Sequence, residues 1–146
     1  LNSIAGADAI CNQRAAEAQL PGFYKAWVSD DFEEPLSRFT RNDGPYVLTD
    51  GTRIADNWDD LVDGELLAPI NVMENGHQAM GDSYVWAGTN HVGTHVPHDC
   101  EEWTSSSDES YGRFGRFFMN NAEWSGDPVS LRNCSNVARL YCFQQS

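Results

Sequence analysis

The sequence predicts a single α+β domain spanning residues 1–146, and three features carry this prediction. Near the N-terminus, apolar residues recur at helical spacing until a Pro-Gly pair. Beyond Pro69 the chain is rich in glycine, serine, asparagine and aromatic residues, which is typical of short strands joined by long polar loops. The chain has four cysteines, and some of them lie near each of its two ends. Early helices followed by a strand-rich half, in a chain of single-domain length, indicate the α+β class.

The first expected element is a helix in the segment GADAICNQRAAEAQLPG, which Pro21 and Gly22 bring to an end. Its apolar face consists of Ala7, Ile10, Cys11, Ala15 and Ala18. The next segment, FYKAWVSD, combines aromatic and β-branched residues and is expected to be a strand, followed by the acidic turn DDFEEP. This pattern places Cys11 on the buried face of the first helix.

The middle of the chain predicts a short strand at residues 46–48, a turn at Asp50-Gly51 and a second helix near residues 56–62, with Asp56 as its cap. Three further strands are expected in SYVWAG, GRFGRFF and ARLYCF. The acidic segment DNWDDLVDGE lacks the alternating spacing of an EF-hand loop. Its carboxylates are therefore interpreted as the solvated face of the second helix.

The charge balance excludes several classes of partner. The chain has 22 acidic and 9 basic residues and a formal charge of −13. This charge opposes binding to nucleic acid, to heparin and to anionic membranes, because all three reward clustered lysine and arginine. No stretch approaches the roughly 20 apolar residues of a membrane span, so no membrane insertion is expected. The first residues also lack the pattern of a signal peptide, so we expect any such peptide to be gone already.

The cysteines indicate the compartment. Cys11, Cys100, Cys134 and Cys142 allow three pairings, and the residues alone do not choose among them. None of them forms a C-x-x-C pair, which disfavours a zinc ribbon or a thioredoxin-type redox site. An even number of cysteines then indicates two structural disulfides in an oxidising compartment. The protein is therefore expected outside the cell, either secreted or displayed on the cell surface.

Several segments together resemble the endostatin domain of collagens, and more closely its bacterial relatives of unassigned function, a branch of the C-type-lectin-like fold. The matching segments are ADAICNQRAAEAQLPGFYKAWVSD, YVLTDGTRIADNWDDLVDGELLAPINV, VWAGT, CEEW and CSNVARLYC. The resemblance implies two helices packed on a twisted, mainly antiparallel sheet with long loops. It also implies the nested disulfides Cys11–Cys142 and Cys100–Cys134. This fold hosts binders of sugars, proteins and ice as well as a few enzymes, so it does not decide the function.

The calcium-dependent sugar site of true C-type lectins is not expected here. Neither the Glu-Pro-Asn or Gln-Pro-Asp triplet nor the Trp-Asn-Asp triplet of that site is present. A structural calcium site is still an alternative, because hard cations need only oxygen ligands from carboxylates and loop carbonyls. Among the tryptophans, Trp124 is the best candidate for exposure, and a sugar ring could stack on it. The side chains expected to orient that sugar are Asn120, Asn121 and Asp127. Packing of Trp124 in the core is, however, the interpretation that the sequence favours over this sugar site.

The segment NHVGTHVPHDCEEW is the most unusual local feature, because it concentrates histidines beside carboxylates. Imidazole and carboxylate groups bind zinc, copper and nickel, so this loop is a candidate transition-metal site. The candidate ligands are His91, His95, His98 and Asp99. Gly93 and Pro97 exclude a regular helix here, so helical ligand spacing does not apply. Endostatin's own zinc site uses histidines near its N-terminus, where this chain has none. The alternative is that these are ordinary loop histidines.

The sequence predicts binding rather than catalysis. It has no G-x-S-x-G motif, and no cysteine stays free if both bridges form. We therefore expect a non-catalytic module, not an enzyme, that binds a glycan or another extracellular protein. The first alternative is a structural subunit of an extracellular filament or matrix, in which copies of the chain meet. The second is a metal-dependent hydrolase that uses the histidine loop.

Overall fold

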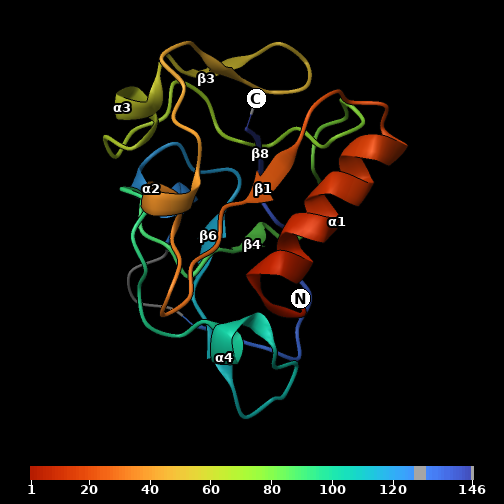
Figure 1. Cartoon of the computed structure of the whole chain (residues 1–146), viewed down its shortest axis with the longest axis vertical. Helices are drawn as coiled ribbons and strands as arrows, with labels where there is room; N and C mark the ends of the chain where they lie inside the picture. Colours follow the sequence, from red (N-terminus) through yellow and green to blue (C-terminus); the bar gives the residue numbers. More distant parts are fainter. Residues whose placement is uncertain (127–130, 146) are drawn as a thin grey trace.

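The computed structural model describes residues 1–126 and 131–145 and shows a small α+β domain (Figure 1). In this part of the chain one helix is long, and the others are short turns. The helices are α1 (Ser3–Glu17), α2 (Pro35–Arg38), α3 (Trp58–Leu61), α4 (Cys100–Trp103) and the 3-10 helix η1 (Ala122–Trp124). The strands are β1 (Tyr24–Ala26), β2 (Tyr46–Val47), β3 (Arg53–Ala55), β4 (Tyr84–Trp86), β5 (Tyr111–Gly112), β6 (Phe114–Arg116), β7 (Arg132–Asn133) and β8 (Cys142–Gln144).

The described strands form four separate antiparallel pairs, β1–β8, β2–β3, β4–β6 and β5–β7. The α+β class is thus confirmed, but the expected single sheet covered by two helices is not what the structure shows. Each strand is only two or three residues long, because glycine-rich and polar segments interrupt the aromatic runs. Gly112, at the end of β5, has no room for a side chain, since a Cβ atom would lie 2.8 Å from Cys100 Sγ.

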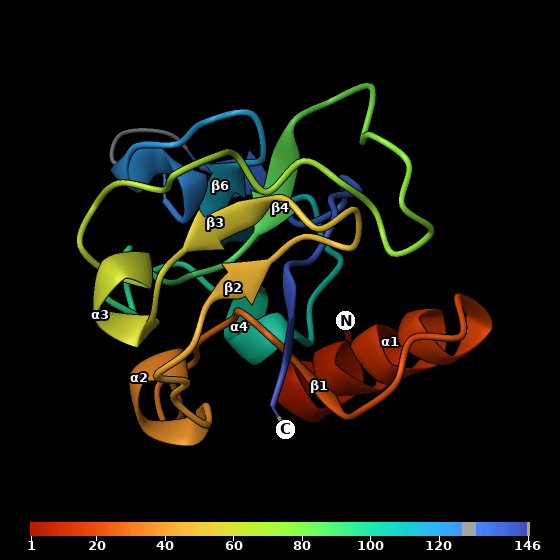
Figure 2. The same ribbon diagram turned by 90° about the horizontal axis from the view of Figure 1, so that it is seen from above.

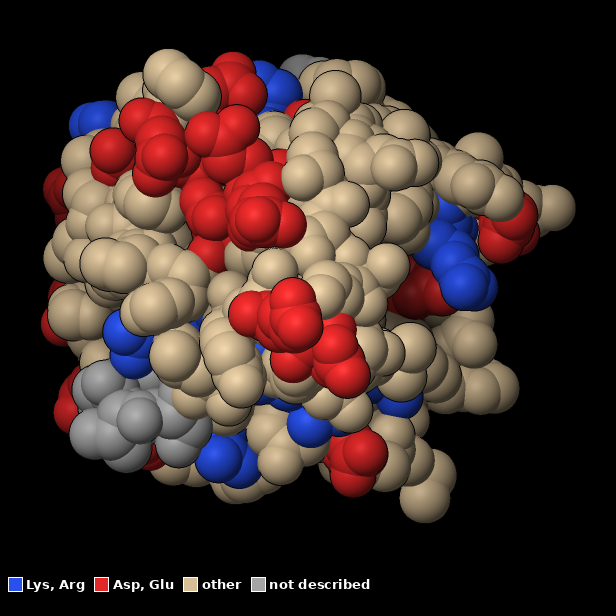
Figure 3. Space-filling model, turned by 90° about the horizontal axis from the view of Figure 1, so that it is seen from below, with Lys and Arg blue, Asp and Glu red and all other residues tan. Residues whose placement is uncertain are grey.

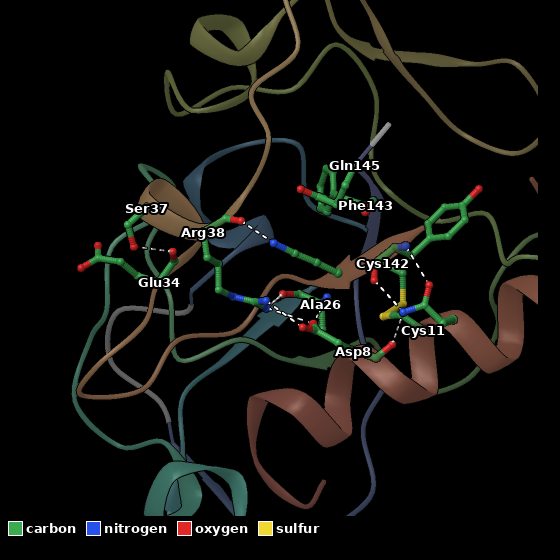
Figure 4. A network of polar contacts seen from close by, with 12 residues as sticks. Asp8, Cys11, Ala26, Glu34, Ser37, Arg38, Cys142, Phe143 and Gln145 are labelled. Atoms are coloured by element: carbon green, nitrogen blue, oxygen red, sulfur yellow. Dashed lines mark hydrogen bonds and ion pairs between the residues drawn. A yellow bond between two sulfur atoms is a disulfide. The ribbon is translucent and has the colours of Figure 1, made fainter. Parts of the chain in front are cut away.

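Helix α1 takes the place of a neighbouring strand beside β1 (Figure 4). The backbone N–H groups of Tyr24 and Ala26 donate to the Asn12 and Asp8 side chains, each at 2.8 Å. Arg38 donates to the same Asp8 carboxylate at 2.9 Å, and both side chains are largely buried. Buried backbone N–H groups need hydrogen-bond acceptors. On the edge of β1 that faces away from β8, the side chains of α1 supply these acceptors in place of another strand.

The chain has two disulfides in the nested order that the resemblance implies, and the outer one joins the two ends of the chain to each other. Cys11 on α1 is bonded to Cys142 on β8, and Cys100 on α4 is bonded to Cys134 after β7. Cys11 lies on the buried face of α1, as its helical spacing predicts. Disulfides of this kind indicate an oxidising environment.

The core consists of two clusters of buried side chains. The larger one surrounds Trp27, which contacts Phe39, Trp58, Trp124 and Phe143. The smaller one joins the inner face of α1 to Trp86, Trp103 and both disulfides. The predicted burial of Trp27, Trp58 and Trp86 is confirmed. None of the helices in the described residues is long and apolar enough to span a membrane.

The second predicted helix exists as α3, but its cap differs from the prediction. Asn57 occupies the N-cap, and its side-chain oxygen accepts from the Asp60 backbone N–H at 2.9 Å. Asp56 lies one residue earlier, where its backbone N–H donates to the Asp60 carboxylate. Asparagine and aspartate cap helices about equally well, so local composition did not separate the two positions.

Candidate functional site

The backbone of α4 is a left-handed turn. Its four residues, Cys100–Trp103, all have φ between 53° and 65°. A left-handed conformation costs roughly 1–2 kcal/mol for each residue that carries a side chain. Contacts on both sides of the turn offset this cost. Cys100 is held by its disulfide, and the buried Trp103 ring donates through Nε1 to the Ser29 carbonyl at 2.8 Å. The turn thereby holds Asp99 and the glutamates that follow it against the segment after β1.

Three side chains of metal-ligand type converge beside this turn. His95 Nε2 lies 3.3 Å from Asp99 Oδ2 and 3.9 Å from Asp31 Oδ1. One ligand atom from each residue lies within 4.8 Å of the other two, and no other trio in the described part of the chain meets this criterion. His95 Nε2 is shielded from solvent and has no hydrogen-bond partner within the described residues. We call Asp31, His95 and Asp99 the Asp-His-Asp cluster.

Two tight turns and a hydrogen bond position these side chains. Residues 89–95 form a hairpin in which Thr89 pairs with His95, so His95 returns towards the protein body. Asp99 is fixed because its carboxylate accepts the Glu102 backbone N–H at 3.0 Å. Asp31 lies in the acidic turn after β1, where the neighbouring Asp30 carboxylate accepts two backbone N–H groups. The cluster is therefore built from loops that the backbone holds in place.

The surroundings of the cluster are strongly negative. Figure 3, which views the molecule from the side of α4, shows acidic side chains gathered on this face. Partial burial raises the pKa of Glu102, and the carboxylates of Asp30, Asp31 and Asp99 raise it further. Carboxylates gathered on one face repel one another, and a bound cation would relieve this repulsion.

Replacing Glu102 with glutamine should stabilise the protein at neutral pH. A raised pKa means that the charged form of Glu102 is less stable in the folded protein than in the unfolded chain. This charged form lowers the free energy of unfolding at pH values above the raised pKa. This destabilisation vanishes below the ordinary pKa of about 4.5, where Glu102 is protonated in both the folded and the unfolded protein. Urea unfolding at pH 7 and at pH 3.5 should show a gain for Glu102→Gln at pH 7 only.

Glu109→Gln, an exposed residue in another loop, is the matched control and should leave the pH profile of stability unchanged. A loss of stability for Glu102→Gln at pH 7, or an equal gain at both pH values, would contradict the electrostatic explanation. The first result would mean that Glu102 makes a favourable contact in the fold.

The histidine loop was predicted only in part. Of the four candidate ligands, the structure brings together His95 and Asp99, whereas His91 and His98 lie elsewhere. The hairpin directs His91 away from the Asp-His-Asp cluster and towards Gly64. A Cβ atom placed on Gly64 would lie 3.6 Å from the His91 ring. His98 is exposed and has a left-handed backbone. Loop residues close in sequence point in different directions, which residue type alone does not show.

The cluster includes one residue that sequence reasoning missed. Asp31 belongs to the segment DDFEEP, which the sequence identified only as an acidic turn. Its place beside His95 follows from the hydrogen bond that ties Trp103 to Ser29. No spacing pattern in the sequence links these two segments.

Trp124 packs in the core, as the favoured interpretation of the sequence predicts, so the candidate sugar site on its ring is wrong. Its side chain is fully buried, with its ring centroid 5.0 Å from that of Trp27 and 5.5 Å from that of Tyr141. It offers no face to a sugar, although Asn120 and Asn121 are exposed. Asn121 instead caps η1 by accepting the Glu123 backbone N–H at 3.0 Å. Asp127, the remaining member of this predicted site, lies outside the described residues.

An exposed aromatic ring does lie next to the Asp-His-Asp cluster. Phe32 follows Asp31 directly, and 83% of it is exposed to solvent. Its backbone N–H donates to Asp30, which fixes the turn that presents the ring. The face thus combines metal-ligand side chains with an apolar ring. No family model matches the chain, and a search of curated proteins finds no significant match.

Proposed function

We propose that this protein is an extracellular, non-catalytic binding domain that holds a divalent transition metal at the Asp-His-Asp cluster and binds a glycan or protein ligand beside it. The observation that carries this proposal is the convergence of one imidazole nitrogen and two carboxylate oxygens from loops far apart in the sequence. The exposed Phe32 ring next to the cluster supplies an apolar contact for the ligand.

The choice of metal follows from the ligand atoms. Zinc is usually bound by four ligands drawn from histidine, cysteine and carboxylate side chains. Calcium prefers six to eight oxygen atoms, and an imidazole is a poor substitute for one of them. Three protein ligands leave a further coordination position open for water or for a ligand group. His95 suits the role of a metal ligand, because its shielded Nε2 has no hydrogen-bond partner within the described chain.

The fold proposed with this function is the endostatin-like branch of the C-type-lectin-like fold. The nested disulfides support this assignment, as does an α+β domain built from short antiparallel strand pairs and long loops. The disulfides also support a location outside the cell. A hydrolase that uses all three loop histidines has no such support, because only His95 joins the cluster.

Titration of chelator-stripped protein with zinc chloride, followed by isothermal calorimetry, tests the metal site. We expect one zinc ion per chain, and we expect His95→Ala and Asp99→Asn each to weaken binding by about tenfold or more. His98→Ala is the matched control, because His98 is an exposed histidine of the same loop outside the cluster. Binding should also weaken in acid, because a protonated imidazole has no lone pair for the metal.

Equal zinc binding by the wild type and His95→Ala would contradict the metal site, as would an equal loss for His98→Ala. A glycan array probed with and without zinc then tests the ligand. Phe32→Ala should reduce glycan binding and leave zinc binding unchanged. Assembly of the protein alone as its concentration rises would instead favour the structural-subunit alternative.

A further inference from the structure

A groove of about 1010 Å³ lies apart from the Asp-His-Asp cluster and has no role in the function proposed above. Residues 140–145, which include β8, line its floor. Ile10 and Arg14 of α1 line one wall, and residues 45–49 and 70–74 line another. Figure 2 shows the dark blue strand β8 between α1 and the β2–β3 hairpin, viewed from the side opposite to that of Figure 3. The groove is therefore a second candidate site.

The floor of the groove offers an open strand edge. Trp27 N–H donates to the Tyr141 carbonyl and Gln145 N–H to the Phe23 carbonyl, so odd-numbered residues of this segment bond to the residues that flank β1. In an antiparallel pair the residues between them direct their N–H and C=O groups to the opposite side. Leu140 and Cys142 are such residues, and their backbone groups have no hydrogen-bond partner within the described residues. At Leu140 and Cys142 this edge can therefore pair with another strand.

The charge of the groove is opposite to that of the whole chain. Arg14, Arg41 and Arg139 line it, together with a single acidic residue, Glu74. All three arginines are exposed, and none forms an ion pair within the described residues. In a chain with a net charge of −13, such a local excess of positive charge favours an acidic occupant.

We propose that the groove binds an extended peptide segment with acidic side chains, which adds to the outer edge of β8 as a third strand. The open edge supplies main-chain hydrogen bonds, and the apolar lining receives alternate side chains. Apolar groups in this lining include Ile10, Leu20, Val47 and Leu140. A small ligand would leave the strand edge unpaired, which is why a peptide fits the groove better. The arginines select the acidic side chains that flank the apolar ones.

The test uses nuclear magnetic resonance of the ¹⁵N-labelled chain titrated with the blocked peptide Ac-Glu-Val-Thr-Val-Thr-Val-Glu-NH2. We expect the amide signals of Leu140 and Cys142 to shift and their hydrogen exchange to slow. Arg14→Gln should weaken binding by about threefold, as expected for an exposed charge pair. Arg53→Gln is the matched control, because Arg53 is paired with Asp56 and does not line the groove.

Two altered peptides complete the experiment. Methylation of alternate backbone nitrogens removes the donors of one peptide edge and should abolish the shifts, since main-chain pairing then fails. Replacing both glutamates with lysine should weaken binding. The inference is overturned if millimolar peptide leaves Leu140 and Cys142 unshifted, if the lysine peptide binds equally well, or if the shifts map to the Asp-His-Asp cluster. Zinc binding is not involved in this result, so the two proposals can fail separately.

Discussion

The double substitution Cys11→Ala with Cys142→Ala should lower the free energy of unfolding by about 4 to 5 kcal/mol. The bridge joins residues 131 positions apart, so it removes more freedom from the unfolded chain than a short loop would. In the folded state it ties the buried face of α1 to β8. Urea unfolding followed by tryptophan fluorescence measures the loss.

The second disulfide provides the matched control. Cys100 and Cys134 are 34 positions apart, so chain entropy predicts a smaller loss, about 3 to 4 kcal/mol, for Cys100→Ala with Cys134→Ala. This bridge also anchors the left-handed turn of α4. A larger loss here than for the first bridge would contradict the ranking by loop length, and would show that the turn depends on its anchor for more than chain entropy.

Elements with strong local signals were the ones that the sequence could predict. The helical spacing of small apolar residues fixes α1, and the aromatic and β-branched run fixes β1. The sequence favoured burial of Trp124 without excluding exposure, because its neighbours in NNAEWSGDP are polar and typical of a surface loop. Its burial depends on Trp27 and Tyr141, which reach it only in the folded chain.

The candidate site, too, could be predicted only where local sequence patterns were enough. Residue type and local density were enough to select His95 and Asp99. The direction of each loop side chain depends on the hairpin at residues 89–95 and on the left-handed turn, and neither has a clear sequence signature. Asp31 enters the site through a contact between distant segments. A site assembled from loops is therefore less predictable than one carried by a single helix.

Replacing Trp27 with alanine should lower the free energy of unfolding by about 3 to 5 kcal/mol, as for other large-to-small changes in a core. The side chain is fully buried, and four aromatic rings lie with their centroids 5.0 to 6.1 Å from its own. Alanine would leave a cavity that these rings cannot fill, because each is held by contacts of its own. Thermal and urea unfolding should both show the loss.

The indole of Trp27 also makes a polar contact, and a third variant separates it from packing. Trp27 Nε1 donates to Ser125 Oγ at 2.8 Å, and that hydroxyl donates to the Thr89 carbonyl at 2.6 Å. Ser125→Ala keeps the ring but leaves its N–H unpaired, which should cost about 1–3 kcal/mol. Trp27→Phe loses the same bond and part of the volume, so its cost should lie between those of Ser125→Ala and Trp27→Ala. If Ser125→Ala costs as much as Trp27→Ala, the buried hydrogen-bond chain, rather than the packing of five aromatic rings, holds this core together.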